Sequence, residues 1–218
     1  MTAMSGSRPA ARPKVFCVGF QKTGTTTLEK ALQMLGMEVA SVYGRNLPFG
    51  ILQETYVEEG LRRAREVDAV QDMPWPLLFR ELDAAFPDAC FILTTRSEDG
   101  WWRSILGHFG GNGDVMQALT YGEDADAPLG HESRYRRIFR EHNEAVRAHF
   151  AAREGKLLEL DLTRGADWQP LCGFLGVEPP AEPFPFANQR FQDPSRKRDL
   201  RRKTLNLANA AMRPFERD

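Results

Sequence analysis

A short segment near the start of the chain combines residue types that bind phosphate or sulfate groups. Residues 19–27 read Gly-Phe-Gln-Lys-Thr-Gly-Thr-Thr-Thr. The two glycines let the backbone turn tightly and approach a ligand, the threonines supply hydroxyl groups, and Lys22 supplies a positive charge. An ordinary strand-to-helix turn requires only one capping threonine. The composition therefore favours an anion-binding loop at the N-terminus of a helix.

The position of the lysine separates this loop from the common ATP- and GTP-binding loop. That loop reads G-x-x-x-x-G-K-[ST], with the lysine directly after the second glycine. Gly19 and Gly24 have the required spacing, but Thr25 follows Gly24 and the lysine lies earlier, at Lys22. Two alternatives stay open at this point. One is a nucleotide kinase or NTPase with an atypical loop, for which Asp161 is the nearest metal-binding aspartate, and the other is a non-catalytic nucleotide-binding protein.

A second candidate anion site follows the most apolar run of the chain. Residues 90–95, Cys-Phe-Ile-Leu-Thr-Thr, predict a buried strand that ends at Arg96, and Ser104 follows eight residues later on a predicted helix. A guanidinium group can bind a phosphate through two hydrogen bonds, and a hydroxyl group can donate a third. From the residues alone, Arg96 could equally form a surface ion pair or contact an anion.

The elements that would position these residues alternate between strands and helices. Apolar runs predict strands, and amphipathic or charged stretches predict helices. The expected strands cover 14–19, 38–42, 69–71, 90–95 and 157–160, and the expected helices cover 25–35, 53–65, 76–86, 98–108, 133–153 and 168–175. The Gly- and Asp-rich segment 107–128 predicts a loop or mobile cap. This order is typical of a three-layer α/β/α fold with a central parallel sheet and a P-loop-like topology, in which ligands bind at the carboxyl ends of the strands.

Composition and charge exclude several classes of protein. The chain has 218 residues, of which 42% are hydrophobic and 27% charged, which predicts one globular domain over 14–218 after a flexible tail at 1–13. Its 29 Lys and Arg nearly balance its 30 Asp and Glu, which argues against a nucleic-acid partner. No apolar run is long enough to span a membrane. The start lacks the apolar core of a signal peptide, and Cys17, Cys90 and Cys172 read as buried free thiols, so a cytoplasmic location is expected.

The two anion-binding motifs resemble those of the sulfotransferases that use 3′-phosphoadenosine-5′-phosphosulfate, in the bacterial and lower-eukaryotic branch with an Asp-x-Pro element. The loop is similar to the K-[ST]-G-T-T loop of that family, and Arg96 with Ser104 is similar to its 3′-phosphate motif. The resemblance covers roughly 14–189. It implies that the donor is bound by Gln21, Lys22, Thr23, Gly24, Thr25, Thr26, Thr27, Arg96 and Ser104. Cytosolic members usually carry a tryptophan where Thr27 stands, so adenine contacts would come from elsewhere.

The resemblance also implies catalytic roles. Lys22 would stabilise negative charge on the departing 5′-phosphate. The base that accepts the acceptor's proton is, in cytosolic members, a histidine of an H-x-P sequence, and Asp-Met-Pro at 72–74 occupies the matching place. Asp72 is therefore the first candidate base. Glu54 is the second, because other members place a glutamate base on a helix after the loop, and His108, one turn beyond the phosphate-binding serine, is the third.

Other features leave the partners partly open. The acceptor would be a hydroxyl or amine of a small molecule, a glycan or a lipid, the donor product would be adenosine 3′,5′-bisphosphate, and no metal is expected. His131, His142 and His149 lie among charged residues and are expected at the surface. Both a monomer and a homodimer fit the sequence. A basic run predicts either a solvated face or a loop over the 3′-phosphate, and comprises Arg196, Lys197, Arg198, Arg201, Arg202 and Lys203.

Overall fold

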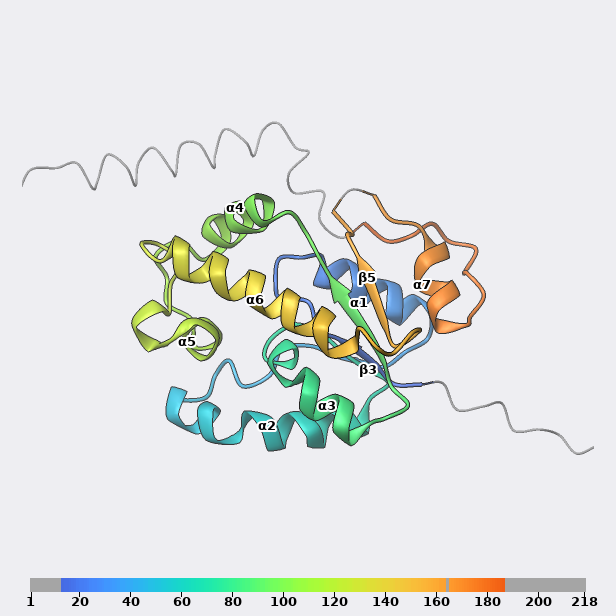
Figure 1. Ribbon diagram of the computed structural model, residues 1–218, viewed down its shortest axis with the longest axis horizontal. Helices are drawn as coiled ribbons and strands as arrows, with labels where there is room; N and C mark the ends of the chain where they lie inside the picture. Colours follow the sequence, from blue (N-terminus) through green and yellow to red (C-terminus); the bar gives the residue numbers. More distant parts are fainter. Residues whose placement is uncertain (1–12, 164, 187–218) are drawn as a thin grey trace, which may run out of the picture.

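A five-stranded parallel sheet forms the centre of the molecule in the computed structural model, which describes residues 13–163 and 165–186 (Figure 1). The strand order is β2-β3-β1-β4-β5, and every neighbouring pair is parallel. The strands are β1 Val15–Cys17, β2 Val39–Ala40, β3 Ala69–Val70, β4 Cys90–Thr94 and β5 Leu157–Leu160. The predicted parallel sheet is confirmed, with shorter strands than the apolar runs suggested.

Helices connect the strands and cover both faces of the sheet. The helices are α1 Thr25–Met34, α2 Phe49–Glu66, α3 Phe79–Ala85, α4 Glu98–Phe109, α5 Val115–Tyr121, α6 Glu132–Phe150 and α7 Trp168–Leu175, with short 3-10 turns η1 at Trp75–Leu78 and η2 at Glu123–Ala125. Apolar side chains of α1 and α7 pack on one face, and those of α2, α3 and α6 pack on the other. The three-layer α/β/α fold expected from the sequence is confirmed.

The sheet is buried on both faces because successive residues of its strands point to opposite sides. In β1, Val15 and Cys17 contact the cluster that contains α1 and α7, whereas Phe16 contacts the cluster on the opposite face. Each of these three side chains is completely buried. A continuous apolar run, rather than an alternating one, is therefore the pattern that this central strand requires.

The segment 107–128 is not the loop or mobile cap that its composition predicted, because it contains α5 and η2. Asp114 caps α5 by accepting a hydrogen bond from the Met116 amide at 2.8 Å. Met116 and Tyr121 are then buried against neighbouring helices. A helix of seven residues shows too few turns for its periodicity to stand out in sequence. Tertiary packing stabilises such a short helix.

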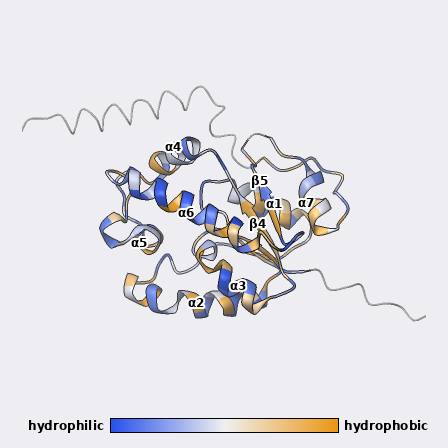
Figure 2. Cartoon of the chain, viewed as in Figure 1, coloured by the Kyte–Doolittle hydropathy of each residue, from blue (hydrophilic) through white to orange (hydrophobic). Residues whose placement is uncertain are grey.

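A third apolar cluster lies beyond the carboxyl ends of the strands and is rich in aromatic rings. It joins the loop after β1 to α4, α5 and α6, through Phe20, Trp101, Tyr121, Tyr135 and Phe139. The ring of Trp101 stacks on Phe139 with centroids 4.2 Å apart. Figure 2 shows hydrophilic stretches along the outside of α6, the helix that contributes Tyr135 and Phe139. This aromatic cluster supports the loop after β1 from the side of the helices.

Several expectations concern the chain as a whole. All three cysteines are free thiols, and Cys17 and Cys172 are buried as expected, whereas Cys90 is only partly buried. Within 13–163 and 165–186, no helix has the length and apolar character needed to cross a bilayer. Most of the predicted N-terminal tail and the whole basic run at 196–203 lie outside the described residues.

Candidate active site

Three adjacent strands deliver the main predicted site residues to one edge of the sheet. β1 lies between β3 and β4 in the parallel sheet. The Lys22 loop follows β1, Asp72 follows β3, and Arg96 follows β4. Parallel strands have their carboxyl ends on the same side, where open α/β sheets bind ligands. The fold therefore brings together segments that are far apart in the sequence.

The loop after β1 packs closely against the end of β4. A Cβ atom on Gly19 would lie 2.1 Å from Thr94 Oγ1 and 2.4 Å from the Thr94 carbonyl oxygen, so only glycine fits there. The Thr23 hydroxyl donates to the Phe20 carbonyl at 2.5 Å and, in turn, accepts from the Thr94 hydroxyl at 2.6 Å. Thr23 is completely buried. Its hydroxyl thus holds the loop in shape and is already engaged within the protein.

Two candidate catalytic residues hold an uncommon backbone conformation. Lys22 has φ of 70° and Asp72 has φ of 67°, and no other non-glycine residue in the described part of the chain has positive φ. The left-handed region costs a non-glycine residue roughly 1–2 kcal/mol. Such strain concentrates at functional sites, where the surrounding structure maintains it. The backbone geometry therefore singles out the same two residues as the sequence motifs do.

The N-terminus of α1 is directed at the loop without a capping side chain from the described residues. Gly24 occupies the cap position with φ of 110°, and its carbonyl accepts from the Thr27 and Leu28 amides. The first turn of α1 contains no acidic side chain. By contrast, Ser97 and Asp114 cap α4 and α5. The partial positive charge of the α1 N-terminus therefore adds to that of Lys22 and favours an anion.

Arg96 contacts the loop directly. Its Nη1 donates to the Lys22 carbonyl at 3.2 Å, across 74 residues of sequence. Gly100 leaves room for this side chain, because a Cβ atom there would lie 3.0 Å from Arg96 Nε. Burial lowers the pKa of Arg96, Arg103 lowers it further, and Asp161 opposes both effects. The shift shows that the guanidinium is partly removed from water beside another cation, an environment that an anionic ligand would relieve.

Ser104 lies in the second turn of α4 and is buried, with 6% of its surface exposed. Helical residues three and four positions apart share a face. Ser104 therefore lies on the same side of α4 as Gly100, the residue over which Arg96 passes. The role of this serine in phosphate binding stays a prediction.

Asp72 occupies a position where its carboxylate is more basic than usual. Burial raises its pKa, and the Met73 amide, Arg45 and Lys22 oppose that shift. The Met73 amide donates to Asp72 Oδ1 at 2.8 Å, and the Thr25 hydroxyl lies at 3.5 Å from Oδ2. The electrostatic effect of Lys22 on Asp72 means that the two charged groups lie near each other. Such an arrangement can bind an anion and accept a proton nearby.

Glu29 is a second carboxylate beside Asp72 that the sequence motifs did not indicate. It lies on α1, one turn after Thr25, and its Oε2 accepts from Gln71 Nε2 at 3.1 Å. Burial raises the pKa of Glu29, and the negative charge of Asp72 raises it further. The helical i, i+4 spacing from Thr25 is the signal that could have revealed it, because the two side chains then share one face.

The other two candidate bases lie on exposed parts of helices. Glu54 is exposed on α2, which is the second helix after the loop, whereas α1 follows the loop directly. His108 is exposed in the last turn of α4, about 15 Å along the helix from its first residue. Their catalytic roles stay predictions, but the placement favours Asp72 over both.

His142 packs against the segment that follows β1 and is not at the surface, which corrects the expectation from the sequence. Its Nε2 donates to the Val18 carbonyl at 2.7 Å, and its ring stacks on Phe20 with centroids 4.1 Å apart. Burial lowers its pKa to about 4. His149 is also partly buried, with Nε2 at 2.8 Å from Asp83 Oδ2. Both histidines lie among charged residues in the sequence, so these contacts on the inward face of α6 were not expected.

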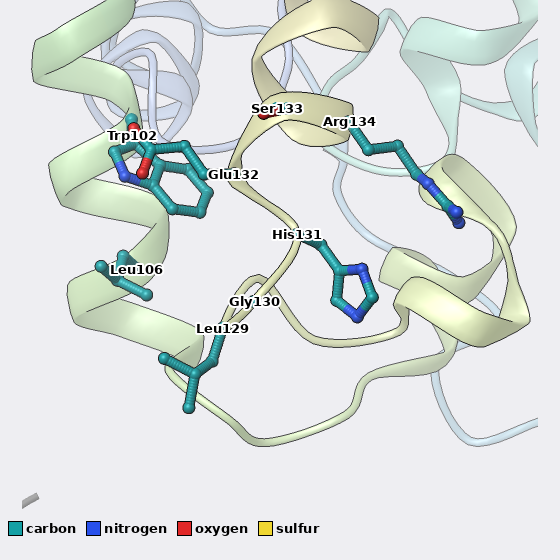
Figure 3. A pocket seen from close by; sticks show the side chains of 8 residues that line it. All are labelled: Trp102, Leu106, Leu129, Gly130, His131, Glu132, Ser133 and Arg134. Atoms are coloured by element: carbon teal, nitrogen blue, oxygen red, sulfur yellow. The ribbon is translucent and has the colours of Figure 1, made fainter.

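Two surface hollows lie away from this site. One, of about 520 Å³, is lined by Trp102 and Leu106 of α4 and by the segment 129–134 (Figure 3). Another, of about 800 Å³, is lined mainly by apolar residues near α7. Neither includes a predicted site residue. The candidate site is therefore identified by its side chains and backbone, and not by the size of a hollow.

Comparisons with known proteins agree with this geometry. The family model described as "Sulfotransferase domain" matches residues 14–119 and 106–192. A protein of Aspergillus versicolor named "Ava biosynthesis cluster protein M" is 28% identical over 213 residues, covering 79% of each chain. The matched ranges contain the Lys22 loop, Asp72 and Arg96. The chain therefore belongs to the sulfotransferase domain family.

Proposed function

We propose that the protein transfers a sulfuryl group from 3′-phosphoadenosine-5′-phosphosulfate to a hydroxyl or amine of an acceptor. The observation that supports this most directly is the 3.2 Å hydrogen bond between Arg96 and the Lys22 carbonyl. This donor carries anionic groups on both the 5′ and the 3′ side of its ribose. A protein that binds it requires two anion sites in one cleft, and the two strand-end motifs provide them.

The residues present fit the two ends of such a donor. On the 5′ side, Lys22, the Thr26 hydroxyl and the first amides of α1 would hold the phosphosulfate. On the 3′ side, Arg96 and Ser104 would hold the phosphate. Thr26 is exposed at the start of α1, whereas the Thr23 hydroxyl is already engaged within the loop. Thr23 and Gly24 are therefore expected to bind the phosphosulfate through their backbone amides.

Proton transfer and charge stabilisation are assigned to different residues. The donor supplies an activated sulfuryl group, whose transfer leaves negative charge on the 5′-phosphate. The ammonium group of Lys22 stabilises that charge. Asp72 accepts the proton from the acceptor's O–H or N–H, and its raised pKa makes it a better base than an exposed aspartate. Lys22 keeps the two tasks coupled, since it also favours the ionised form of Asp72.

A small-molecule acceptor is favoured over a glycan or a lipid. The relative from Aspergillus versicolor is named for a biosynthesis cluster.

The atypical kinase or NTPase is disfavoured, because Thr25 and not a lysine follows Gly24. A nucleotide kinase would lack the lysine that contacts the β- and γ-phosphates.

A transfer assay tests the proposal. The purified full chain is incubated with donor labelled in its sulfuryl group and with panels of phenols, alcohols and amines. We expect label to appear on at least one acceptor class with the wild type and not with Lys22→Ala. Lys30→Ala removes an exposed lysine from α1, the helix that follows the loop. It is the matched control and should retain transfer. Transfer of the γ-phosphate of ATP in place of sulfate would contradict the proposal.

A further inference from the structure

A cluster of buried polar side chains lies between the Lys22 loop and α5. Gln21 precedes Lys22 and is 5% exposed, while Gln117 and Tyr121 of α5 are 0% and 3% exposed. Gln21 Nε2 donates to Gln117 Oε1 at 3.3 Å. The remaining atoms, Gln21 Oε1, Gln117 Nε2 and Tyr121 Oη, make no hydrogen bond to any group in the described part of the chain.

This concentration of unpaired polar atoms is unusual for a protein interior. Buried polar groups are nearly always hydrogen-bonded to protein or to ordered water, so each exception requires a physical reason. Five buried side-chain atoms lack a partner among the described residues, and three of them belong to this cluster. The other two belong to Gln71 and Asn143, which lie on β3's continuation and on α6. The cluster is therefore a specific feature of the loop's surroundings.

The walls of the cluster are rigid. The Trp101 indole N–H donates to the Gln21 carbonyl at 3.1 Å, which fixes the backbone at this residue. The Tyr121 ring stacks on Tyr135 with centroids 3.6 Å apart. Burial raises the pKa of the Tyr121 hydroxyl and contact with Gln21 lowers it, so the two side chains are neighbours, although neither Gln21 Oε1 nor Tyr121 Oη has a hydrogen bond of normal geometry. The Gln21 backbone and the Tyr121 ring are therefore held in place, and the side chains can adjust only by rotation of the two terminal amides.

The three unpaired atoms complement a single oxygen that both donates and accepts. Gln117 Nε2 is a donor, Gln21 Oε1 is an acceptor, and the Tyr121 hydroxyl can be either. An oxygen with O–H groups can accept from Gln117, donate to Gln21 and pair with Tyr121. Water meets this description, and buried waters commonly make about three such hydrogen bonds. An anion would leave Gln21 Oε1 without a donor, so the chemistry selects a neutral hydroxyl oxygen.

We propose that Gln21, Gln117 and Tyr121 form a buried binding site for one water molecule that joins α5 to the phosphosulfate loop. Through this water, the side chain of Gln21 is held from two residues of α5 as well as by its direct bond to Gln117. Gln117 and Tyr121 are thus positioning residues, which act on the loop and Lys22 through Gln21. The proposal rests on the loop being the donor site, as proposed above.

A crystal structure of the full chain tests the water site itself, without depending on the enzyme's activity. At a resolution that shows ordered solvent, we expect one oxygen within hydrogen-bond distance of all three side chains, with no acceptor added. Density for that oxygen should disappear in Gln117→Met. If the three side chains instead pair directly with one another, or if no oxygen is found among them, the proposal is wrong.

Paired measurements of stability and donor-product affinity test the positioning role. Gln117→Met and Tyr121→Phe keep the approximate size of the buried groups, but each removes a hydrogen-bond partner of Gln21 or of the water, so the thermal midpoint should fall. The affinity for adenosine 3′,5′-bisphosphate should fall by about 5–10-fold, because the loop is less well fixed. Thr120→Ala is the control, since its hydroxyl bonds only to the Met116 carbonyl of its own helix, at 2.6 Å.

The outcomes separate the possible roles of the cluster. A lower thermal midpoint with unchanged affinity would indicate packing alone and would overturn the positioning role. If the wild type fails to bind the bisphosphate, the proposed function fails first. Amide hydrogen exchange of residues 21–25 then still decides the inference. Faster exchange in Gln117→Met than in Thr120→Ala would support it, and equal exchange would overturn it.

Discussion

Lys22 and Asp72 show how individual residues combine strain with electrostatics. Both hold positive φ, and each lies directly beyond the end of a strand. The lysine lowers the pKa of the aspartate while burial raises it. Sequence motifs indicated both residues, because glycine spacing and the Asp-x-Pro pattern are visible in the sequence. Glu29 was not indicated, because its relation to Asp72 depends on how α1 is placed over β3.

Replacing Lys22 with alanine should lower the turnover number by roughly 10²–10³-fold, the usual effect of removing one group that stabilises charge in the transition state. Steady-state kinetics with a fixed acceptor measure this loss. Lys30→Ala removes a nearby exposed charge and should change turnover by less than about twofold. A comparable loss in both variants would show that general electrostatics, and not the position of Lys22, supports transfer.

Asp72→Asn should separate catalysis from stability. Turnover should fall by roughly 10²–10⁴-fold, because the proton acceptor is lost, while affinity for the bisphosphate stays nearly constant. The folded-state pKa of Asp72 lies above its unfolded value, so ionisation opposes folding, and this penalty grows as pH rises through the folded-state pKa. At neutral pH the variant should therefore unfold at a temperature a few degrees higher. Unchanged turnover would remove Asp72 as the base.

The pH dependence of the wild-type enzyme follows from the same group. The rate should fall on the acid side as Asp72 becomes protonated, with a midpoint above the ordinary aspartate pKa because burial raises it. Glu29→Gln removes a neighbouring negative charge and should move this acid midpoint downward. A pH–rate profile that keeps its midpoint in this variant would show that the two carboxylates do not interact during turnover.

At the scale of elements, the five strands and six of the helices were predicted from the sequence, but α5 was not. The apolar run at 90–95 is sufficient to predict β4, and the glycine-flanked loop is sufficient to predict the start of α1, because both patterns are local in the sequence. α5 does not, because its seven residues are stabilised by the Asp114 cap and by burial against distant helices. His142 is a similar case, since its partners Val18 and Phe20 belong to another element.

The contact of His142 on α6 with the segment after β1 should make the free energy of unfolding fall in mild acid. The pKa of His142 is about 4 in the folded state against 6.5 for an ordinary histidine, so the folded state resists protonation. Stability is then fully present above about pH 6.5 and is lost as pH falls toward 4, by roughly 3 kcal/mol for this group alone. Urea unfolding at several pH values measures the loss.

A variant assigns this acid sensitivity to the histidine. His142→Gln retains an amide donor near the Val18 carbonyl and cannot become protonated in this range. Its unfolding free energy should therefore depend less on pH between about 6.5 and 4 than that of the wild type. An unchanged slope in the variant would show that other groups cause the loss.

At the scale of the whole molecule, the fold assembles a site from three separate segments. The sequence predicted that the Lys22 loop, Asp72 and Arg96 each follow a strand, but not that β1 lies between β3 and β4. Strand order decides which strand ends are neighbours, and it depends on long-range packing that local patterns do not encode. The bond from Arg96 to the Lys22 carbonyl is the clearest product of that order.

The Lys22 loop and Arg96 are proposed to bind one nucleotide together, with phosphates at both ends. Calorimetric titration of the wild type and of Arg96→Ala with two ligands tests this proposal: adenosine 3′,5′-bisphosphate, and adenosine 5′-phosphate, which lacks the 3′ group. We predict that the variant binds the bisphosphate about 10–100-fold more weakly than the wild type does, and the monophosphate equally well. Equal losses for both ligands, or tighter binding of ATP with Mg²⁺ than of the bisphosphate, would contradict the account.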